Sequence, residues 1–176
     1  CILTDKKEKI HIIATGGTID KAYSPSSQMN ELREKSIVPA YLTELIGSAD
    51  YFTFEQVMML DSRDLTDDHR HKILFAITAS GASQIIITHG TDTMVETASY
   101  LKNHMPDMNQ TIILTGAMIP IDGFYKTDAG FNLGYAIATA QQITHGIYIC
   151  MNGKIFDPAD VQKNIVASRF EKISAA

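Results

Sequence analysis

The sequence predicts an α/β protein with a doubly wound, flavodoxin-like sheet of about five mostly parallel strands and helices on both faces. Three observations lead to this prediction. Five short apolar runs recur along the chain, the cores of most of them are almost entirely apolar and rich in Ile, and amphipathic segments lie between them. Continuous apolar runs are typical of strands covered on both faces, and alternation of strands with helices favours parallel pairing.

The expected strands cover residues 10–14, 51–60, 84–88, 111–115 and 146–151. Only the second run alternates between apolar and polar residues, which is typical of a strand at the edge of a sheet. Asn152-Gly153, in "MNGKIF", is a hairpin signal and predicts a short antiparallel ribbon at the end of the sheet. In a sheet ordered 2-1-3-4-5, the first and third strands flank the point where the strand order reverses.

The expected helices cover residues 66–81, 93–105 and 128–143. Thr66 opens the first of them and Gly81 closes it. Thr93 and Glu96 have the spacing of a capping box at the start of the second.

Two segments have no periodic apolar face. The longest, residues 19–38, is rich in Ser, Pro, Gln and Asn, and irregular segments of this length in compact domains are usually functional lids or disordered. Residues 169–176, "RFEKISAA", are interpreted as a surface tail.

Length and composition exclude several classes of protein. The 176 residues fit a single domain, and 45% apolar with 20% charged residues is typical of a soluble globular protein. A net charge of −5, with 15 Lys and Arg residues against 20 Asp and Glu, argues against a nucleic-acid partner. Because no apolar run approaches the roughly 20 residues that span a bilayer, we expect no membrane insertion.

Cysteine use gives limited information about the compartment. The chain contains only Cys1 and Cys150, so we expect a reduced, buried Cys150 rather than a disulfide framework. A cytoplasmic location is favoured. A periplasmic or lipid-anchored protein stays open as an alternative, because the sequence starts at Cys1 and shows nothing upstream of it.

Polar residues follow the expected strands at the edge where ligands bind to open α/β sheets. The order 2-1-3-4-5 brings Thr18, after the first strand, opposite Thr91 and Asp92, after the third. Gly16 and Gly17 permit positive φ and a close approach of the backbone to a ligand, and their N–H groups could bind an oxyanion. A plain tight turn or a phosphate cradle is the alternative interpretation of this Gly-Gly turn.

A threonine hydroxyl is a weak nucleophile unless a neighbouring group takes its proton. Asp92 together with Lys163, or Tyr23 from the long irregular segment, could provide that group for Thr18.

Other polar residues have structural interpretations. His69 and His71 point to different sides of a helix and favour a solvated surface over metal ligation. His89, just beyond a buried strand, is typical of a hydrogen-bonded structural histidine. Asp61 and Asp64 could pair as acid and base, but turn capping is the commoner use of Asp in such a position.

Several motifs occur in a fixed order along residues 10–165. They are "ATGGTI" (14–19), "THGTDTMVETA" (88–98), "TGAM", "DAGFNL" and "MNGKIFDPADVQK". In these motifs the chain resembles the bacterial-type L-asparaginase family, also called asparaginase/glutaminases. The resemblance covers the N-terminal domain of that family only, so we expect residues 1–176 to form one such α/β domain with no C-terminal domain.

The resemblance implies a role for each matching residue. Thr18 corresponds to the nucleophile that attacks the side-chain amide. Thr91, Lys163 and Asp92 correspond to a second constellation, in which Lys163 lowers the cost of deprotonating Thr91 and Asp92 keeps the lysine charged. Tyr23 is the best match to the tyrosine of the family's mobile lid.

The resemblance also implies a substrate site. Ser62 would bind the α-carboxylate of the substrate, Asp92 its α-ammonium, and backbone N–H groups near Ala117 and Thr91 the oxyanion. The implied substrate-binding residues are Gly17, Asp61, Ser62, Thr91, Asp92 and Ala117.

The implied reaction is hydrolysis of L-asparagine or a related amide to the acid and ammonia through a threonine acyl-enzyme. It needs no metal and no organic cofactor, and its only small-molecule partner is the amide; the family implies a homo-oligomer. The alternatives are a non-catalytic or weakly active amino-acid-binding module, a fragment that requires the missing C-terminal domain, and a nucleotide-binding domain that uses Gly16 and Gly17 for phosphate.

Arg63 departs from the family pattern, which commonly has a neutral polar residue after the binding serine. A positive charge facing the pocket would oppose a free α-ammonium. Three interpretations follow: the Arg63 side chain points away, pairs with Asp64, or marks a different amide substrate.

Overall fold

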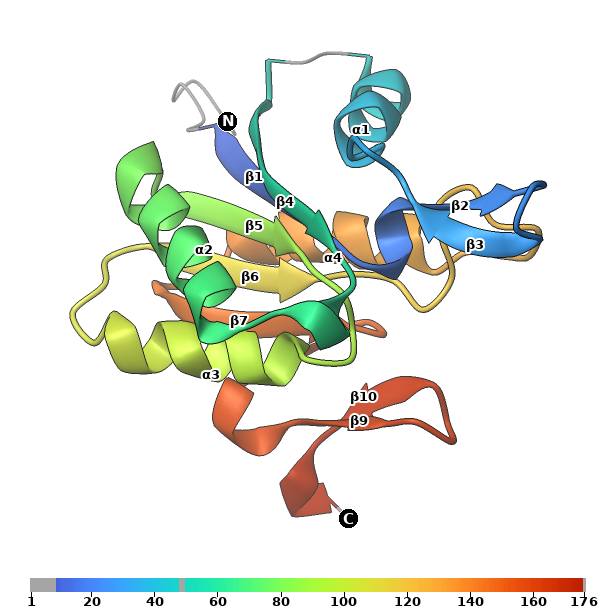
Figure 1. Ribbon diagram of the computed structural model, residues 1–176. Coiled ribbons are helices and arrows are strands. Elements are labelled where there is room, and N and C mark those ends of the chain that lie inside the picture. Colours follow the sequence, from blue (N-terminus) through green and yellow to red (C-terminus); the bar gives the residue numbers. More distant parts are fainter. Residues whose placement is uncertain (1–8, 48–49, 176) are drawn as a thin grey trace, which may run out of the picture.

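A mixed six-stranded sheet with helices on both faces forms the centre of the protein in a computed structural model that describes residues 9–47 and 50–175 (Figure 1). Its strands are β1 (Ile10–Gly16), β4 (Phe52–Leu60), β5 (Gln84–Thr88), β6 (Thr111–Thr115), β7 (Gly146–Met151) and β8 (Lys154–Phe156). They are ordered β4-β1-β5-β6-β7-β8, with β8 antiparallel to β7 and the other pairs parallel. The order 2-1-3-4-5, the edge position of β4 and the Asn152-Gly153 hairpin are therefore confirmed.

Helices cover the sheet in two layers (Figure 1). They are α1 (Val38–Ile46), α2 (Asp67–Ser80), α3 (Met94–His104) and α4 (Ala129–Ala140). Side chains alternate across a strand, so Ile85 and Ile87 of β5 join the core beneath α2 and α3, while Ile86 joins the core beneath α1 and α4. This explains why the central strands are apolar throughout.

The prediction of an irregular segment at residues 19–38 was wrong. This segment forms a hairpin of β2 (Lys21–Ser24) and β3 (Met29–Leu32) and leads into α1, which was not predicted. Asp20, which is fully buried, accepts hydrogen bonds from the Ser36 hydroxyl (2.8 Å) and the Ile37 N–H (2.9 Å). Burial raises the pKa of Asp20. The Asp20 carboxylate thus accepts the hydrogen bonds of the residues just before α1, and no local sequence pattern reveals this contact.

The C-terminal segment is not a surface tail as predicted. Strands β9 (Gln162–Asn164) and β10 (Arg169–Glu171) form a second antiparallel ribbon. Phe170 is only 1% exposed and belongs to the core beneath α2 and α3, and its N–H donates to Asn152 Oδ1 (2.9 Å). A single apolar residue among polar neighbours was too weak a signal for the sequence interpretation.

The ends of two helices test the capping predictions. Thr66 caps α2 and Gly81 ends it in the left-handed conformation, as predicted, although His69 supplies the second half of the capping box. The Thr93-x-x-Glu96 box does not form in α3, because the Thr93 hydroxyl donates to the Ser62 carbonyl (2.7 Å) instead.

Cys150 is a buried free thiol, as predicted, whereas Cys1 lies outside the described residues. No helix in residues 9–47 and 50–175 has both the length and the apolar character needed to cross a membrane.

Candidate active site

β1 and β5 are parallel neighbours in the sheet, so their carboxyl ends lie at the same edge (Figure 1). Gly17 follows β1 with φ of 85°, and a Cβ built at this position would lie 2.4 Å from the backbone N and Cα of Gly90. Only glycine therefore allows the two backbones to touch here. Because Thr18 and Thr91 each follow one of these glycines, the two threonines start from adjacent points of the backbone. Thr18 is half-buried and Thr91 is buried.

Lys163 completes a cluster with the residues after β5. Its Nζ donates to Thr91 Oγ1 (2.7 Å) and to Asp92 Oδ1 (2.6 Å). The lysine reaches them from β9, 72 residues further along the chain. An ammonium at this distance favours a negative charge on the threonine oxygen, and the carboxylate holds the ammonium in place through the second hydrogen bond. The structure thus brings together Thr91, Asp92 and Lys163, as the sequence analysis expected.

A short 3-10 turn after β4 carries the next charged group. Asp61 accepts hydrogen bonds from Arg63 Nε (2.9 Å), Arg63 Nη2 (3.0 Å) and Lys21 Nζ (2.9 Å). The hydrogen bond from Arg63 and then that from Lys21 hold the pKa of Asp61 well below its usual range. Arg63 Nε also lies 3.7 Å from Asp92 Oδ2. Arg63 therefore faces the cluster and pairs with Asp61, rather than pointing away or pairing with Asp64.

Ser62 lies deep in the same turn, with 2% exposure. Its carbonyl accepts from the Thr93 hydroxyl and its own hydroxyl accepts from the Thr93 N–H (3.4 Å). A Cβ at Gly90 would come within 2.6 Å of the Ser62 hydroxyl. The turn that carries Ser62 and Arg63 is consequently fixed against the start of α3.

Tyr23 lies on β2 of the hairpin, 42% exposed, and its ring packs edge-on against Phe124 at 5.0 Å. Within the described part of the chain, no hydrogen bond joins Tyr23 to Thr18 or Lys163. Ala117 is buried just beyond β6. Tyr23 and Ala117 therefore lie on segments near the carboxyl edge of the sheet, but Tyr23 is not hydrogen-bonded to the cluster of Lys163 with Thr91 and Asp92.

A chain of hydrogen bonds holds His89, the residue that directly follows β5. Its Nδ1 lies 2.7 Å from the Gly90 carbonyl, which can only accept, so Nδ1 carries the hydrogen. Nε2 then accepts from the Thr97 hydroxyl (2.9 Å), which accepts in turn from Arg70 Nε (3.2 Å). Burial lowers the pKa of His89 to about 4. The structural interpretation of His89 is thus confirmed.

Sequence reasoning missed two cations of this region, Lys21 and Arg70. Each is bound to a partner at least 27 positions away, Lys21 to Asp61 and Arg70 to Thr97. Arg70 also forms a local ion pair with Asp67 (2.9 Å), three residues earlier on α2, but only the fold reveals the two long-range pairings.

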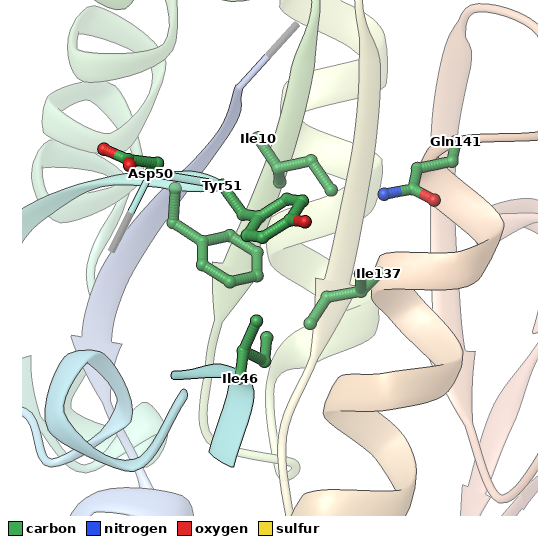
Figure 2. Close-up of a pocket in the computed structure, with 7 residues that line it drawn as sticks. Ile10, Ile46, Asp50, Tyr51, Ile137 and Gln141 are labelled. Carbon is green, nitrogen blue, oxygen red and sulfur yellow. The ribbon is translucent and has the colours of Figure 1, made fainter. Parts of the chain in front are cut away.

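A pocket of about 380 Å³ lies at the other end of the sheet, and Figure 2 shows the residues that line it. Its lining residues are Ile10, Ile46, Asp50, Tyr51, Phe52, Ile137 and Gln141. Ile10 and Phe52 begin β1 and β4, so the pocket opens at the amino ends of the strands, opposite Thr18. Its mostly apolar lining offers no activated hydroxyl. In the described residues, no three His, Cys, Asp or Glu side chains are placed to hold a metal ion.

A family model described as "Asparaginase, N-terminal" matches residues 9–175. The chain belongs to the asparaginase family. The sequence resemblance and the α/β fold that it implied are thereby confirmed.

Relatives show how much of the family's length this asparaginase chain spans. Glutaminase-asparaginase of Acinetobacter glutaminasificans is 29% identical over 169 residues, which cover 90% of this chain and 50% of that protein. The probable periplasmic L-asparaginase of Haemophilus influenzae is 33% identical over 165 residues, covering 88% of this chain and 46% of that protein. The chain thus spans about half the length of the curated relatives it matches.

A solved structure shares the fold. The probable cytoplasmic L-asparaginase from Campylobacter jejuni superposes with a TM-score of 0.79 and 28% identity, over 94% of this chain and 53% of that one. Because similar proteins are named as periplasmic and as cytoplasmic, membership of the asparaginase family does not decide the compartment.

Proposed function

We propose that residues 1–176 form an asparaginase-type N-terminal domain that hydrolyses the side-chain amide of L-asparagine, or a related amide, to the acid and ammonia. The observation that carries the proposal is the position of Lys163, whose Nζ lies 2.7 Å from Thr91 Oγ1 and 2.6 Å from Asp92 Oδ1. A threonine hydroxyl bound to a lysine that is itself hydrogen-bonded to a carboxylate is suited to moving protons. Thr18 lies beside it, where the backbones of β1 and β5 meet.

The proposed reaction has two steps. The Thr18 oxygen attacks the amide carbon, an ester bond forms and the C–N bond breaks, so that the amide nitrogen leaves as ammonia with the hydroxyl proton. Water then adds its hydroxyl group to the acyl carbon and returns a proton to Thr18, which releases the acid. Backbone N–H groups near Ala117 and Thr91 are the proposed donors to the oxyanion in both steps.

The charged cluster has a defined role in this scheme. Lys163 stabilises a negative charge on the Thr91 oxygen, so that Thr91 can take up and return a proton. Tyr23, on the hairpin, is the proposed proton acceptor for Thr18 once substrate is bound. No metal or organic cofactor enters either step.

A second candidate function follows from the length of the relatives. Since the chain spans about half of them, it could also act as a binding module or depend for activity on a C-terminal domain. Ammonia release by the chain alone separates this alternative from the proposed hydrolysis.

We also propose a homo-oligomer. The exposed apolar side chains of Phe124, Ile165 and Val166, which are 86%, 79% and 99% exposed, offer surface for association. Sedimentation equilibrium measures this state directly.

The test of the hydrolysis is ammonia release from L-asparagine and L-glutamine by the purified chain. Thr18→Val and Lys163→Met should each lower the rate by a factor of about 100 or more, because each removes a group that acts on the reacting atoms. Lys102→Met is the matched lysine control, since Lys102 forms only an exposed ion pair with Asp157. A wild-type chain that releases no ammonia, or an active Thr18→Val variant, would contradict the proposal.

A further inference from the structure

Both carboxylate oxygens of Asp92 face a cation in the structure. Oδ1 accepts from Lys163 Nζ at 2.6 Å, and Oδ2 lies 3.7 Å from Arg63 Nε. An ammonium group of a substrate that approached Asp92 would therefore lie next to both cations. The side chain of Arg63 is the more exposed of the two, so its guanidinium is the group that such an ammonium would meet first.

Arg63 is held in its place although it is exposed. Two parallel hydrogen bonds join its guanidinium to the two oxygens of Asp61, and its backbone N–H donates to the same carboxylate (3.1 Å). A bidentate pair of this kind fixes the plane of the guanidinium as well as its position. Movement of Arg63 away from Asp92 would break these bonds, so the positive charge is a constant feature of the site.

The carboxylates beside Arg63 already have cationic partners. Asp61 pairs with Lys21 and Arg63, and Asp92 pairs with Lys163 and lies near Arg63. Asp64, on the same turn as Arg63, acts on its guanidinium more weakly than Asp61 or Asp92 does. The guanidinium therefore places a positive charge beside Asp92 that repels an added ammonium.

We propose that Arg63 makes the site select amides that carry a carboxylate but no free α-ammonium, such as succinamate or an N-acylated asparagine. This inference rests on the proposed hydrolysis for the identity of the reaction, but the charge selection acts on binding. Succinamate is L-asparagine without its amino group, so the pair isolates the effect of that charge. The corresponding products, succinate and L-aspartate, differ in the same way.

Calorimetric titration with succinate and L-aspartate measures the selection without requiring turnover. We expect the wild-type chain to bind succinate at least about tenfold more tightly than L-aspartate, because the Arg63 guanidinium repels the ammonium of L-aspartate even when salt partly screens the charges. Arg63→Gln should reduce this ratio of dissociation constants to within about threefold. Arg169→Gln is the matched control. Arg169 is also exposed and paired with a carboxylate, Glu171, but it lies on β10 outside the cluster, so the variant should keep the wild-type ratio.

Ammonia release from succinamate and L-asparagine provides the second measurement. The ratio of kcat/KM values should favour succinamate about tenfold in the wild-type chain and should shift toward L-asparagine in Arg63→Gln. Absence of ammonia with both amides would contradict the proposed hydrolysis and leave the binding measurement to decide on Arg63. Tighter binding of L-aspartate by the wild-type chain, no binding of succinate, or an unchanged ratio in Arg63→Gln would overturn the inference.

Discussion

Protonation of His89 should destabilise the protein as the pH falls. The imidazole is fully buried, and its Nε2 accepts the hydrogen bond from Thr97. Burial first, and then repulsion from Arg70, lower the pKa of His89 from 6.5 to about 4, against a hydrogen bond to Gly90 that acts in the opposite direction. The unfolded chain therefore binds this proton more readily than the folded chain, and stability falls as the pH falls below 6.5.

The size of the effect follows from these two pKa values. With 6.5 for the unfolded chain and about 4 for the folded one, the free energy of unfolding should drop by about 2 kcal/mol between about pH 7 and pH 5. Carboxyl groups with ordinary pKa values contribute little over this range. A loss of that size is readily measured, since a domain is stabilised by only about 5–15 kcal/mol.

Urea denaturation at both pH values measures this loss in the wild-type chain and in His89→Gln. Glutamine offers a donor and an acceptor but does not titrate, so the variant should lose about 2 kcal/mol less than the wild type. His71→Gln, at an exposed position on α2, should retain the wild-type dependence on pH. Equal losses in the wild type and His89→Gln would refute the assignment of a neutral, buried imidazole.

Two further predictions concern stability. Phe170→Ala should lower the free energy of unfolding by about 3–5 kcal/mol, because Phe170 belongs to the core. Val166→Ala, at a fully exposed position, should change it by less than about 0.5 kcal/mol. Equal effects of the two substitutions in urea denaturation would contradict the packing of β10 against the core. Gly17→Ala should prevent folding or lower the free energy of unfolding by more than about 3 kcal/mol, because the added Cβ would overlap the Gly90 backbone. Gly47→Ala, where φ is similar but the surrounding space is open, should lower it by about 1–2 kcal/mol, as measured by thermal denaturation. A stable Gly17→Ala variant would rule out the contact between Gly17 and Gly90.

The central sheet could be predicted from the sequence because short stretches of residues identify each strand and turn. Runs such as residues 84–88 are apolar on both faces, and Asn152-Gly153 marks the turn between β7 and β8. The segment at 19–38 could not be predicted in the same way. Its order depends on the buried carboxylate of Asp20, which acts on Ser36 and Ile37 across 16 and 17 positions.

In the candidate site too, some features follow from local sequence and others depend on long-range contacts. Position at a strand end was enough to place Thr18 near Thr91, because parallel strands end at one edge of a sheet. Asp92 together with Lys163 was one of two candidates for the activating group, the other being Tyr23, and the family resemblance then implied the grouping of Lys163 with Thr91 and Asp92; no local pattern could place β9, which returns to the site from the far end of the chain. The orientation of Arg63 depends on Asp61 and was left open among three interpretations until the structure gave its partners.

The position of Lys163 has a consequence for folding order. The lysine and Thr91 are 72 residues apart, and β9 is joined to the body of the protein through β10 and Phe170. Long-range contacts of this kind require loop closure and tend to form after local ones. We expect a nascent chain to assemble β1, β4 and β5 before Lys163 has been synthesised, so that the cluster of Thr91, Asp92 and Lys163 forms only after the sheet that supports it.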